Sequence, residues 1–512
     1  MSEWSNGYVA DIGYTYGYYA ELNPLRIKMA FLNAGLAYPE AGTACELGFG
    51  QGMSVNMHAS ASLAEWHGTD FNPSQAAGAQ HMAAAAGTGA QLYDQAFAEF
   101  CARDDLPDFD FIGLHGIWSW VSDENRAVIV DFVRRKLKVG GVLYISYNTM
   151  PGWAAMLPLR ELLTEHNAVM AAPGKQIVPR IDDALAFAER VLETATDYSK
   201  ANPVPKLRLA DMKSTNRNYL AHEYFNRDWE PMSFSAMAKW LEPAKLSFAC
   251  SAVFQDHLDN VLLNPERNKL LAEIEDVNFR QTVRDFLVNQ YFRADYWVRG
   301  ARKLRPLEQR EQLSSQRVLM TADAAAFSMK QKTSRGDIEL QEAIYRPVLD
   351  FLADHKIHSV GQIFEYCGTR NIGMPHASQA VFVLLSLKVL HLVQPDAVIE
   401  QVRQRTSNLN RHLCYMARDS LDMHYLASPV TGGGLIVDRF DQLFLLAKSD
   451  GMANPAQAAA YVDSILSRQG QKLQVEGKTV ETQAEQLQLL EKKAASFQQL
   501  KLPELEALGI VF

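Results

Sequence analysis

The segment Cys45-Glu46-Leu47-Gly48-Phe49-Gly50-Gln51-Gly52 decides how the first half of this chain folds. A short apolar stretch contains Glu46 near its end, glycines then alternate with larger residues, and a helical pattern begins at Gly52. Glycines at these positions allow a tight turn, and they let a ligand lie directly against the main chain. The segment therefore predicts a strand, a ligand-binding loop and a helix, in that order.

The glycine spacing separates three kinds of nucleotide-binding loop. A dinucleotide fingerprint starting at Gly48 needs a glycine where this chain has Met53. A phosphate-binding P-loop needs a lysine followed by serine or threonine, and this loop has none. The observed spacing E-x-G-x-G-x-G favours S-adenosylmethionine, whose ammonium group the Glu46 carboxylate can meet directly or through water. A plain glycine turn between a strand and a helix is the alternative.

Alternating strand-like and helix-like segments extend this unit into a parallel α/β sheet. The expected strands are Thr43–Leu47, Trp66–Thr69, Gln91–Tyr93, Phe109–Leu114 and Val142–Tyr147. A helix is expected after Asn72-Pro73, and another from Ser122 to Lys136, acidic at its start and basic at its end. Leu246–Phe254 and Ala294–Arg299 are expected as late strands. We therefore predict that residues 155–230 form a helical insertion and that the sheet is completed after it.

Polar residues at the expected strand ends are the candidate cofactor ligands. Asp70 ends the second strand, where its carboxylate can accept hydrogen bonds from ribose hydroxyls, although NAD would present a ribose as well. Asp94 follows the third strand, where it could bind an adenine amine or simply cap a helix. His115 and Gly116 follow the fourth strand. The expected cofactor contacts are Glu46, Gly48, Gly50, Gly52, Asp70, Phe71, Asn72, Asp94, His115 and Gly116.

Composition limits the partners and the compartment. With 512 residues the chain should hold two to four domains. A net charge of −9 with interspersed signs argues against general nucleic-acid binding. The five cysteines form no C-x-x-C pair, so neither a metal site nor a disulfide framework is expected, and a reducing, cytoplasmic location fits. The apolar run Ala380–Val393 is about 14 residues long, too short to span a membrane, and is expected as a buried helix.

Two further segments resemble a known family. They are His115-Gly116-Ile117-Trp118-Ser119-Trp120-Val121 and Tyr144-Ile145-Ser146-Tyr147-Asn148-Thr149-Met150-Pro151-Gly152-Trp153. Both are similar to methyltransferases that carry a methyltransferase regulatory domain, whose best understood members are rickettsial protein-lysine methyltransferases acting on an outer-membrane protein. The resemblance extends to His222-Glu223-Tyr224 with Trp229 and Pro231, to Arg299-Gly300, and to Leu426-Ala427-Ser428-Pro429-Val430. Phe49 departs from the pattern, because relatives often have cysteine there, but cofactor binding should survive.

The resemblance implies a Rossmann-like class I methyltransferase sheet with a helical insertion, followed by mainly helical accessory domains. We expect a cofactor-binding core over residues 1–155 and an insertion and regulatory region over 156–305, which completes the sheet and forms a homodimer. A helical, winged-helix-like middle domain should span 306–400, and an α+β domain 401–512. The substrate class stays open: a protein lysine, a small molecule, or no acceptor at all if the protein only binds the cofactor.

Transfer to a lysine requires a neutral amine, which desolvation favours, so an aromatic-lined acceptor pocket is expected. The candidate aromatic residues are Tyr14, Tyr16, Tyr18, Tyr19, Trp118, Trp120, Tyr147 and Trp153. For the acceptor we select Tyr18, Trp118, Tyr147 and Asn148, with His115 contacting either cofactor or acceptor; plain packing is the alternative for each. His222-Glu223 lacks a third metal ligand, and a capping or interdomain hydrogen-bond role is expected for this pair.

Overall fold

The computed structural model describes residues 15–40, 42–172, 174–333, 336–475 and 478–512. Its centre is a seven-stranded sheet in the order β3-β2-β1-β4-β5-β7-β6, in which β7 runs antiparallel to both of its neighbours. The strands are β1 Thr43–Leu47, β2 Glu65–Asp70, β3 Gln91–Asp94, β4 Phe109–Leu114, β5 Leu137–Asn148, β6 Leu246–Ser251 and β7 Phe292–Arg299. The expected α/β sheet is confirmed, including its completion by two late strands.

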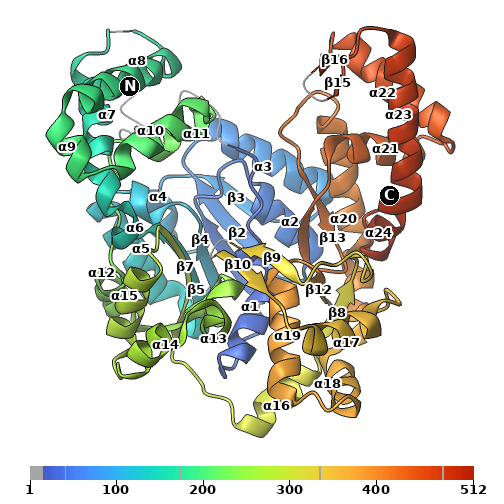
Figure 1. The fold of residues 1–512 in the computed structure, drawn as a ribbon, viewed down its shortest axis with the longest axis horizontal. Helices are drawn as coiled ribbons and strands as arrows, with labels where there is room; N and C mark the ends of the chain where they lie inside the picture. The colour runs from blue at the N-terminus through green and yellow to red at the C-terminus, as the bar shows by residue number, and fades with distance from the viewer. Residues whose placement is uncertain (1–14, 41, 173, 334–335, 476–477) are drawn as a thin grey trace.

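Helices of the first half cover the two faces of this sheet (Figure 1). They are α1 Pro24–Asn33, α2 Met53–Ala61, α3 Pro73–Ala86, α4 Phe97–Cys101 and α5 Asp123–Lys136. Asn72 caps α3 through hydrogen bonds from the backbone of Ser74 and Gln75, and Ser122 caps α5 in the same way. The predicted starts of both helices are therefore confirmed.

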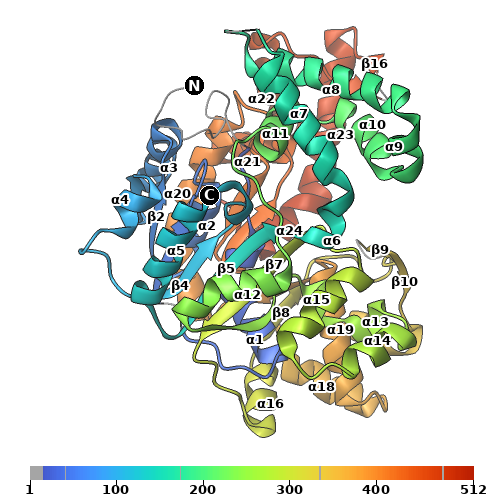
Figure 2. The same ribbon diagram turned by 90° about the vertical axis from the view of Figure 1, so that its left-hand side faces the viewer.

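The expected insertion is a helical layer with an apolar core of its own. Its helices are α6 Met150–Trp153, α7 Leu157–Val169, α8 Ile177–Thr194, α9 Thr196–Ala201, α10 Val204–Ser214 and α11 Arg217–Tyr224. Leu163, Ile181 and Leu185 are among its buried residues. Figure 2 shows this layer above α12 Phe234–Leu241 and α15 Val277–Leu287. The chain then continues through α13 Asp259–Leu262 and α14 Pro265–Ala272 before β7.

Residues 306–400 contain more strand than expected. Helices α16 Pro306–Ser314, α17 Glu342–Leu352, α18 Val360–Thr369 and α19 Met374–Ser386 accompany a three-stranded sheet, β11-β8-β12. Its strands are β8 Arg317–Met320, β11 His358–Ser359 and β12 Leu390–Val393, and β9 Lys330–Thr333 pairs with β10 Gly336–Glu339 as a hairpin. The run Ala380–Val393, expected as one buried helix, is divided between α19 and β12.

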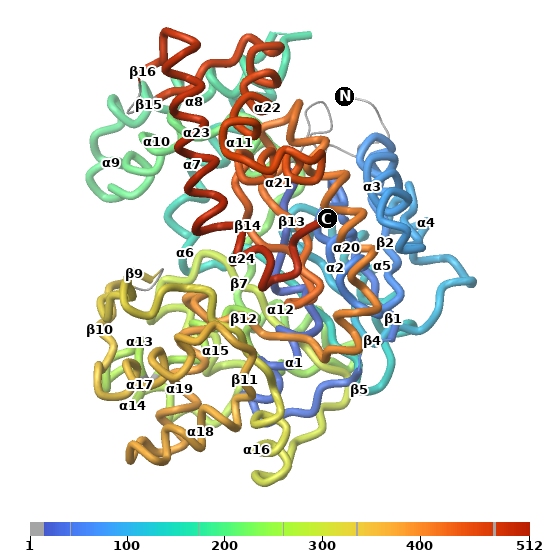
Figure 3. The backbone as a smooth tube through the Cα atoms, turned by 90° about the vertical axis from the view of Figure 1, so that its right-hand side faces the viewer, coloured from blue at the N-terminus to red at the C-terminus, as the bar shows by residue number. Residues whose placement is uncertain are grey.

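The C-terminal region combines helices with two hairpins (Figure 3). Its helices are α20 Asp396–Met416, α21 Arg439–Ser449, α22 Pro455–Arg468, α23 Gln483–Ser496 and α24 Leu502–Ala507. The hairpins pair β13 Tyr425–Ser428 with β14 Gly433–Ile436, and β15 Gln474–Val475 with β16 Lys478–Thr479. The second hairpin lies within the glutamine-rich stretch Gln469–Gln499, for which the sequence predicts helix throughout. No helix in the part of the chain that the structure describes is both long and apolar enough to cross a membrane.

Helix α2 is buried on all sides. All of its residues, from Met53 to Ala61, are buried, and it lies between the sheet and the C-terminal elements α20, β13 and β14. Met53 and Met57 share one apolar cluster with residues of the C-terminal region. The cofactor half and the C-terminal region are therefore joined through a common core.

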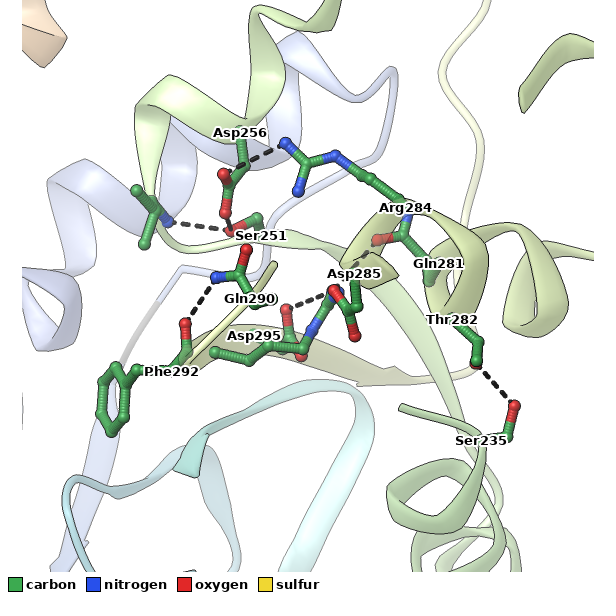
Figure 4. Close-up of polar contacts among 12 residues, drawn as sticks. Ser235, Ser251, Asp256, Gln281, Thr282, Arg284, Asp285, Gln290, Phe292 and Asp295 are labelled. Atoms are coloured by element: carbon green, nitrogen blue, oxygen red, sulfur yellow. Dashed lines mark hydrogen bonds and ion pairs between the residues drawn. The ribbon is translucent and has the colours of Figure 1, made fainter. Parts of the chain in front are cut away.

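A buried ionic network connects α15 to strand β7 (Figure 4). The Arg293 guanidinium donates to Asp285 at 2.6 Å and to Asp295 at 2.8 Å, and the Tyr147 hydroxyl donates to Asp295 at 3.1 Å. Next to it, Arg284 forms ion pairs with Asp256 and Asp259. These contacts fix the antiparallel strand that completes the sheet.

Candidate functional site

The glycine loop after β1 adopts a conformation that side chains disfavour. The φ angles of Gly48, Gly50 and Gly52 are 74°, 56° and 74°, all in the left-handed region. A Cβ at Gly48 would lie 2.3 Å from Cδ1 of Ile117, and one at Gly52 only 2.2 Å from the Cβ of Ala79. The loop therefore has the bare backbone that a ligand needs for close approach.

Asp70, at the end of β2, forms a hydrogen bond with this loop. Its Oδ2 accepts a hydrogen bond from the backbone N–H of Gly50 at 2.9 Å, and its Oδ1 accepts one from Asn72 at 3.0 Å. Burial nevertheless raises the pKa of Asp70 to about 6. The carboxyl is thus held at the cavity wall with its position fixed by two main-chain donors.

A cavity opens over the glycine loop and the ends of β2 and β4. Gly48, Gly50, Asp70, Phe71, His115 and Gly116, all predicted cofactor contacts, line it. Gly52, Asn72 and Asp94 do not line it: Gly52 and Asn72 are the N-caps of α2 and α3, and Asp94 is exposed. Gln95, Ala96 and Phe97 occupy the wall where Asp94 was expected.

Glu46 lies in the core beside the loop and does not line the cavity. Within the described chain, its Oε2 has no hydrogen-bond partner. Burial and the nearby Asp70 carboxyl together raise the pKa of Glu46 to about 8. An unsatisfied buried carboxyl oxygen next to a bare loop is what a cationic ligand group would complete.

His115 contributes a neutral ring to the cavity. Its Nδ1 lies 2.7 Å from the Tyr144 hydroxyl, and its ring stacks on Tyr19 with a centroid separation of 3.5 Å. Burial lowers the pKa of His115 to about 4, so the ring is uncharged at neutral pH. His115 can therefore shape the cavity, but it is a weak base.

The residues selected for the acceptor lie elsewhere, which corrects their expected placement. Tyr147 is fully buried and bonds to Asp295, and Trp118 is buried with its Nε1 3.3 Å from Sδ of Met232. The Asn148 side chain is buried too, and Tyr18 lines a separate cavity facing the C-terminal region. Neither Tyr16 nor Trp153 lines the cavity either, and Tyr14 lies outside the described residues. A role in binding the acceptor would require these side chains to reach the cavity, and they do not line it.

Neighbours of those residues provide the aromatic wall instead. Tyr19 replaces Tyr18, and Trp120 replaces Trp118, while Phe49, Phe71 and Phe97 complete the wall. Both Tyr19 and Trp120 were among the wider set of aromatic candidates, so the signal was present in the sequence. The sequence does not tell which aromatic side chain of each segment faces the cavity, because the side chains of these segments do not alternate between two faces as those of a strand do.

Sequence reasoning also missed the contribution of α11 and the loop after it. His222, Glu223, Asn226 and Asp228 line the same cavity, together with Ser122 and Asn125 at the start of α5. Trp120 Nε1 donates to the carbonyl of Glu223 at 3.5 Å, which ties α11 to the loop after β4. The segment His222-Glu223-Tyr224 was singled out by the resemblance, but it was assigned a structural role.

The described lining residues include acidic groups but no lysine or arginine. Asp70, Glu223 and Asp228 are the carboxyls among them. No group of three His, Cys, Asp or Glu side chains in the described ranges could hold a metal ion. The charged side chains among these residues therefore favour cationic ligand groups.

Comparison with known proteins agrees with this arrangement. Residues 216–299 match a family described as a predicted methyltransferase regulatory domain. Over 512 residues, the chain is 40% identical to the uncharacterized protein sll1526 of Synechocystis, with 99% of each chain covered. The chain belongs to the methyltransferases that carry this regulatory domain. In the present structure, the matched residues 216–299 include helices α11, α12, α14 and α15 and strands β6 and β7.

A solved structure shows the same fold over almost the whole length of this chain. The structure of PKMT2 from Rickettsia typhi in complex with AdoHcy superposes with a TM-score of 0.70 at 16% identity, covering 97% of this chain and 100% of that one. A Rickettsia prowazekii protein, RP789, is 25% identical over 203 residues, which are 38% of this chain and 35% of its own length. The class I methyltransferase fold is therefore confirmed, and it includes the accessory regions.

Proposed function

We propose that this protein is an S-adenosylmethionine-dependent methyltransferase, and that its acceptor is a lysine amine of a protein. The observation that carries the proposal is the loop Gly48–Gly52, with three left-handed glycines anchored by Asp70 at the cavity wall. Membership of a methyltransferase family and the shared fold support it. The name PKMT2 and the bound AdoHcy of the Rickettsia typhi protein support the acceptor and the cofactor by analogy only.

The residues present fit the cofactor. When bound, S-adenosylmethionine supplies a methyl group on a positively charged sulfur, which a nucleophile can displace. The bare loop would hold its amino-acid portion, and Asp70 would bind the ribose hydroxyls. The unsatisfied Glu46 carboxyl lies behind the loop, so it would meet the ammonium group through water. The neutral His115–Tyr19 stack and the aromatic wall would exclude water from the transfer position.

A small-molecule acceptor is the second candidate, and one observation favours it. Residues of the insertion, His222 to Asp228, form part of the cavity wall, so the insertion could close over a metabolite. The two candidates differ in the size of the labelled product. Incubation with cofactor tritiated on the methyl group and with bacterial cell fractions should place the label in protein bands; label in the low-molecular-weight fraction would select the metabolite.

Binding of the cofactor itself is tested by calorimetry with S-adenosylmethionine. We expect Asp70→Ala to weaken binding by at least tenfold, because it removes hydrogen bonds to a charged acceptor and releases the loop at Gly50. Gly50→Arg should abolish binding, because its left-handed backbone would be strained and its long side chain would fill the loop. Asp104→Ala, at an exposed carboxylate, is the control and should bind normally. Unchanged affinity in both loop variants would refute the cofactor assignment.

A further inference from the structure

Glu223 occupies a fixed position in the cavity wall. It lies in the last turn of α11, inside the segment matched by the regulatory domain. The backbone around it is held from three sides: Trp120 Nε1 donates to the Glu223 carbonyl, Arg160 donates to the Tyr224 carbonyl at 3.2 Å, and Asn226 donates to the His222 carbonyl at 2.6 Å. Glu223 therefore lines the cavity from a main chain that is held in place by hydrogen bonds.

The three carboxyls of the cavity are not equivalent. Asp70 already accepts hydrogen bonds from the main chain of the cofactor loop. Asp228 forms an ion pair with Arg227 at 3.0 Å. No ion pair of Glu223 is found among the described residues, although this side chain lies within the cavity wall. Among the described carboxyls of the lining, Glu223 is thus the one whose charge calls for a cation from outside the protein.

We propose that Glu223 binds the ammonium group of the methyl acceptor and removes its proton before transfer. This inference rests on the proposed function, and it adds a role for the regulatory domain: that domain supplies the acceptor-binding carboxylate of the active site. It also restricts the acceptor to a primary or secondary amine. An alcohol, thiol or carboxylate would leave the Glu223 charge uncompensated, because the described lining residues include no lysine or arginine.

The proton balance of this step is simple. The ammonium N–H bond breaks, an O–H bond forms on the Glu223 carboxylate, and the electron pair stays on nitrogen, which becomes the nucleophile. Burial raises the pKa of Glu223 to about 7, and the same desolvation lowers the pKa of an amine bound in the cavity. The two pKa values approach one another, which is the condition for efficient proton transfer at neutral pH.

Other titratable groups near Glu223 affect the pH dependence. The lining residues contribute Tyr19, Asp70, His115, His222 and Asp228. From the packed elements come Tyr219 and Tyr224 of α11, Arg160 of α7 and Arg208 of α10. Asp70 is the main competitor, because its pKa is raised to about 6. A substitution at Glu223 separates the two carboxyls, since Asp70 is retained in that variant.

The test compares a cationic probe with a neutral one of the same shape. The affinities of n-butylamine, which is protonated at the pH values used, and n-butanol for the AdoHcy-bound protein are measured by ligand-observed NMR at pH 8 and pH 5.5. For the natural sequence we expect the amine to bind at least tenfold more tightly than the alcohol at pH 8, and about equally at pH 5.5. Glu223→Gln should remove this preference at both pH values while leaving AdoHcy affinity within twofold.

Two further variants make the result specific. Glu165→Gln, at an exposed carboxylate of α7, is the matched control and should behave as the natural sequence does. Glu223→Asp keeps the charge on a shorter side chain and should retain a weaker, still pH-dependent preference; it also serves if Glu223→Gln does not fold. An amine preference that persists in Glu223→Gln, or that is missing from the natural sequence, overturns the inference. Failure of the natural sequence to bind AdoHcy in calorimetry overturns the proposed function instead.

Discussion

At the scale of single residues, Glu46 is a carboxyl that the folded protein keeps without a counter-charge. Burial and the Asp70 carboxyl raise its pKa to about 8, from the ordinary glutamate value of 4.5. Between these two values the folded state binds more protons than the unfolded state does, so this group lowers stability as the pH rises. Above about pH 8 both states are ionised at Glu46, and its full cost is present.

We therefore predict that Glu46→Gln flattens the pH dependence of stability. The unfolding free energy of the natural sequence should fall with pH between about pH 5 and pH 8, with Glu46 contributing up to about 1.4 kcal/mol per pH unit. The variant should lack this contribution and be the more stable protein at pH 8. Urea unfolding at pH 5, 6.5 and 8 measures the difference, and parallel curves for the two proteins would contradict the assignment.

Tyr147 illustrates why a strand-end residue can be misplaced from sequence. Along β5, Tyr144 and Ser146 face the loop after β4. The Tyr144 hydroxyl is hydrogen-bonded to His115, and the Ser146 hydroxyl accepts a hydrogen bond from the Gly116 N–H. Tyr147 points to the opposite face, because successive side chains of a strand alternate. On that face its hydroxyl donates a hydrogen bond to Asp295. The motif containing Tyr147 was recognised correctly, but the motif does not reveal which face of the sheet carries the cavity.

We expect Tyr147→Phe to affect stability and not cofactor binding. Loss of the buried hydrogen bond to Asp295 should cost about 1–2 kcal/mol of unfolding free energy. Affinity for S-adenosylmethionine, measured by calorimetry, should stay within twofold, since the ring does not line the cavity. A tenfold loss of affinity with unchanged stability would show that Tyr147 reaches the cofactor after all.

At the scale of elements, β7 depends on a buried charge network. Arg293 is almost completely buried and holds two buried carboxylates, Asp285 from α15 and Asp295 from β7 itself. Such a network adds little net stability when complete, but removing one partner leaves buried charges uncompensated. Burial raises the pKa of Asp285 to about 6, so this carboxyl can lose its charge by binding a proton, which becomes harder as the pH rises.

Arg293→Met should therefore destabilise the protein by about 3–5 kcal/mol at pH 7, and by less at pH 5. The sign follows from Asp285, whose pKa burial raises to about 6, so that it takes up a proton at the lower pH and loses its uncompensated charge. Arg134→Met is the control, because its ion pair with Asp131 is exposed and should contribute under about 1 kcal/mol. Equal effects of the two substitutions in urea unfolding would argue against the network.

At the scale of the whole molecule, the accessory regions are part of one folded unit. Helix α2 follows the cofactor loop directly, yet its outer side packs against α20 and β14 (Figure 3). Asn23 donates to the Thr431 carbonyl and Gln394 donates to the Ala61 carbonyl, which links the same regions by hydrogen bonds. The C-terminal region therefore supports the helix that carries the cofactor loop.

A chain ending at residue 305 should accordingly fail to fold on its own. It would expose Met53, Met57 and Met82, which pack into the C-terminal apolar cluster. Burial of these three side chains is worth about 5–9 kcal/mol, comparable to the whole stability of many domains. We expect aggregation, or a chain that binds a hydrophobic dye and shows no cooperative thermal transition. A soluble fragment that binds S-adenosylmethionine normally would contradict this expectation.

The sequence by itself determined the sheet, its late completion, the insertion and the cofactor loop. Each follows from a local signal: alternating glycines at positions 48 to 52, helix caps at Asn72 and Ser122, and short apolar segments for the strands. Each of these patterns spans only a few residues, so the local structure that it predicts can be read without knowing the rest of the chain. The family resemblance then extended the fold to the accessory regions, where the three-stranded sheet and the hairpins β9–β10 and β15–β16 replace helix that the sequence predicts.

Only the tertiary structure decided which side chains surround the cavity. Glu223 is far from the glycine loop in sequence, and it joins the cavity wall because the insertion folds back over the end of the sheet. The choice of Tyr19 over Tyr18, and of Trp120 over Trp118, depends on how two irregular segments are turned by their contacts. Such orientations are set by packing between distant parts of the chain, which leaves no trace in local periodicity.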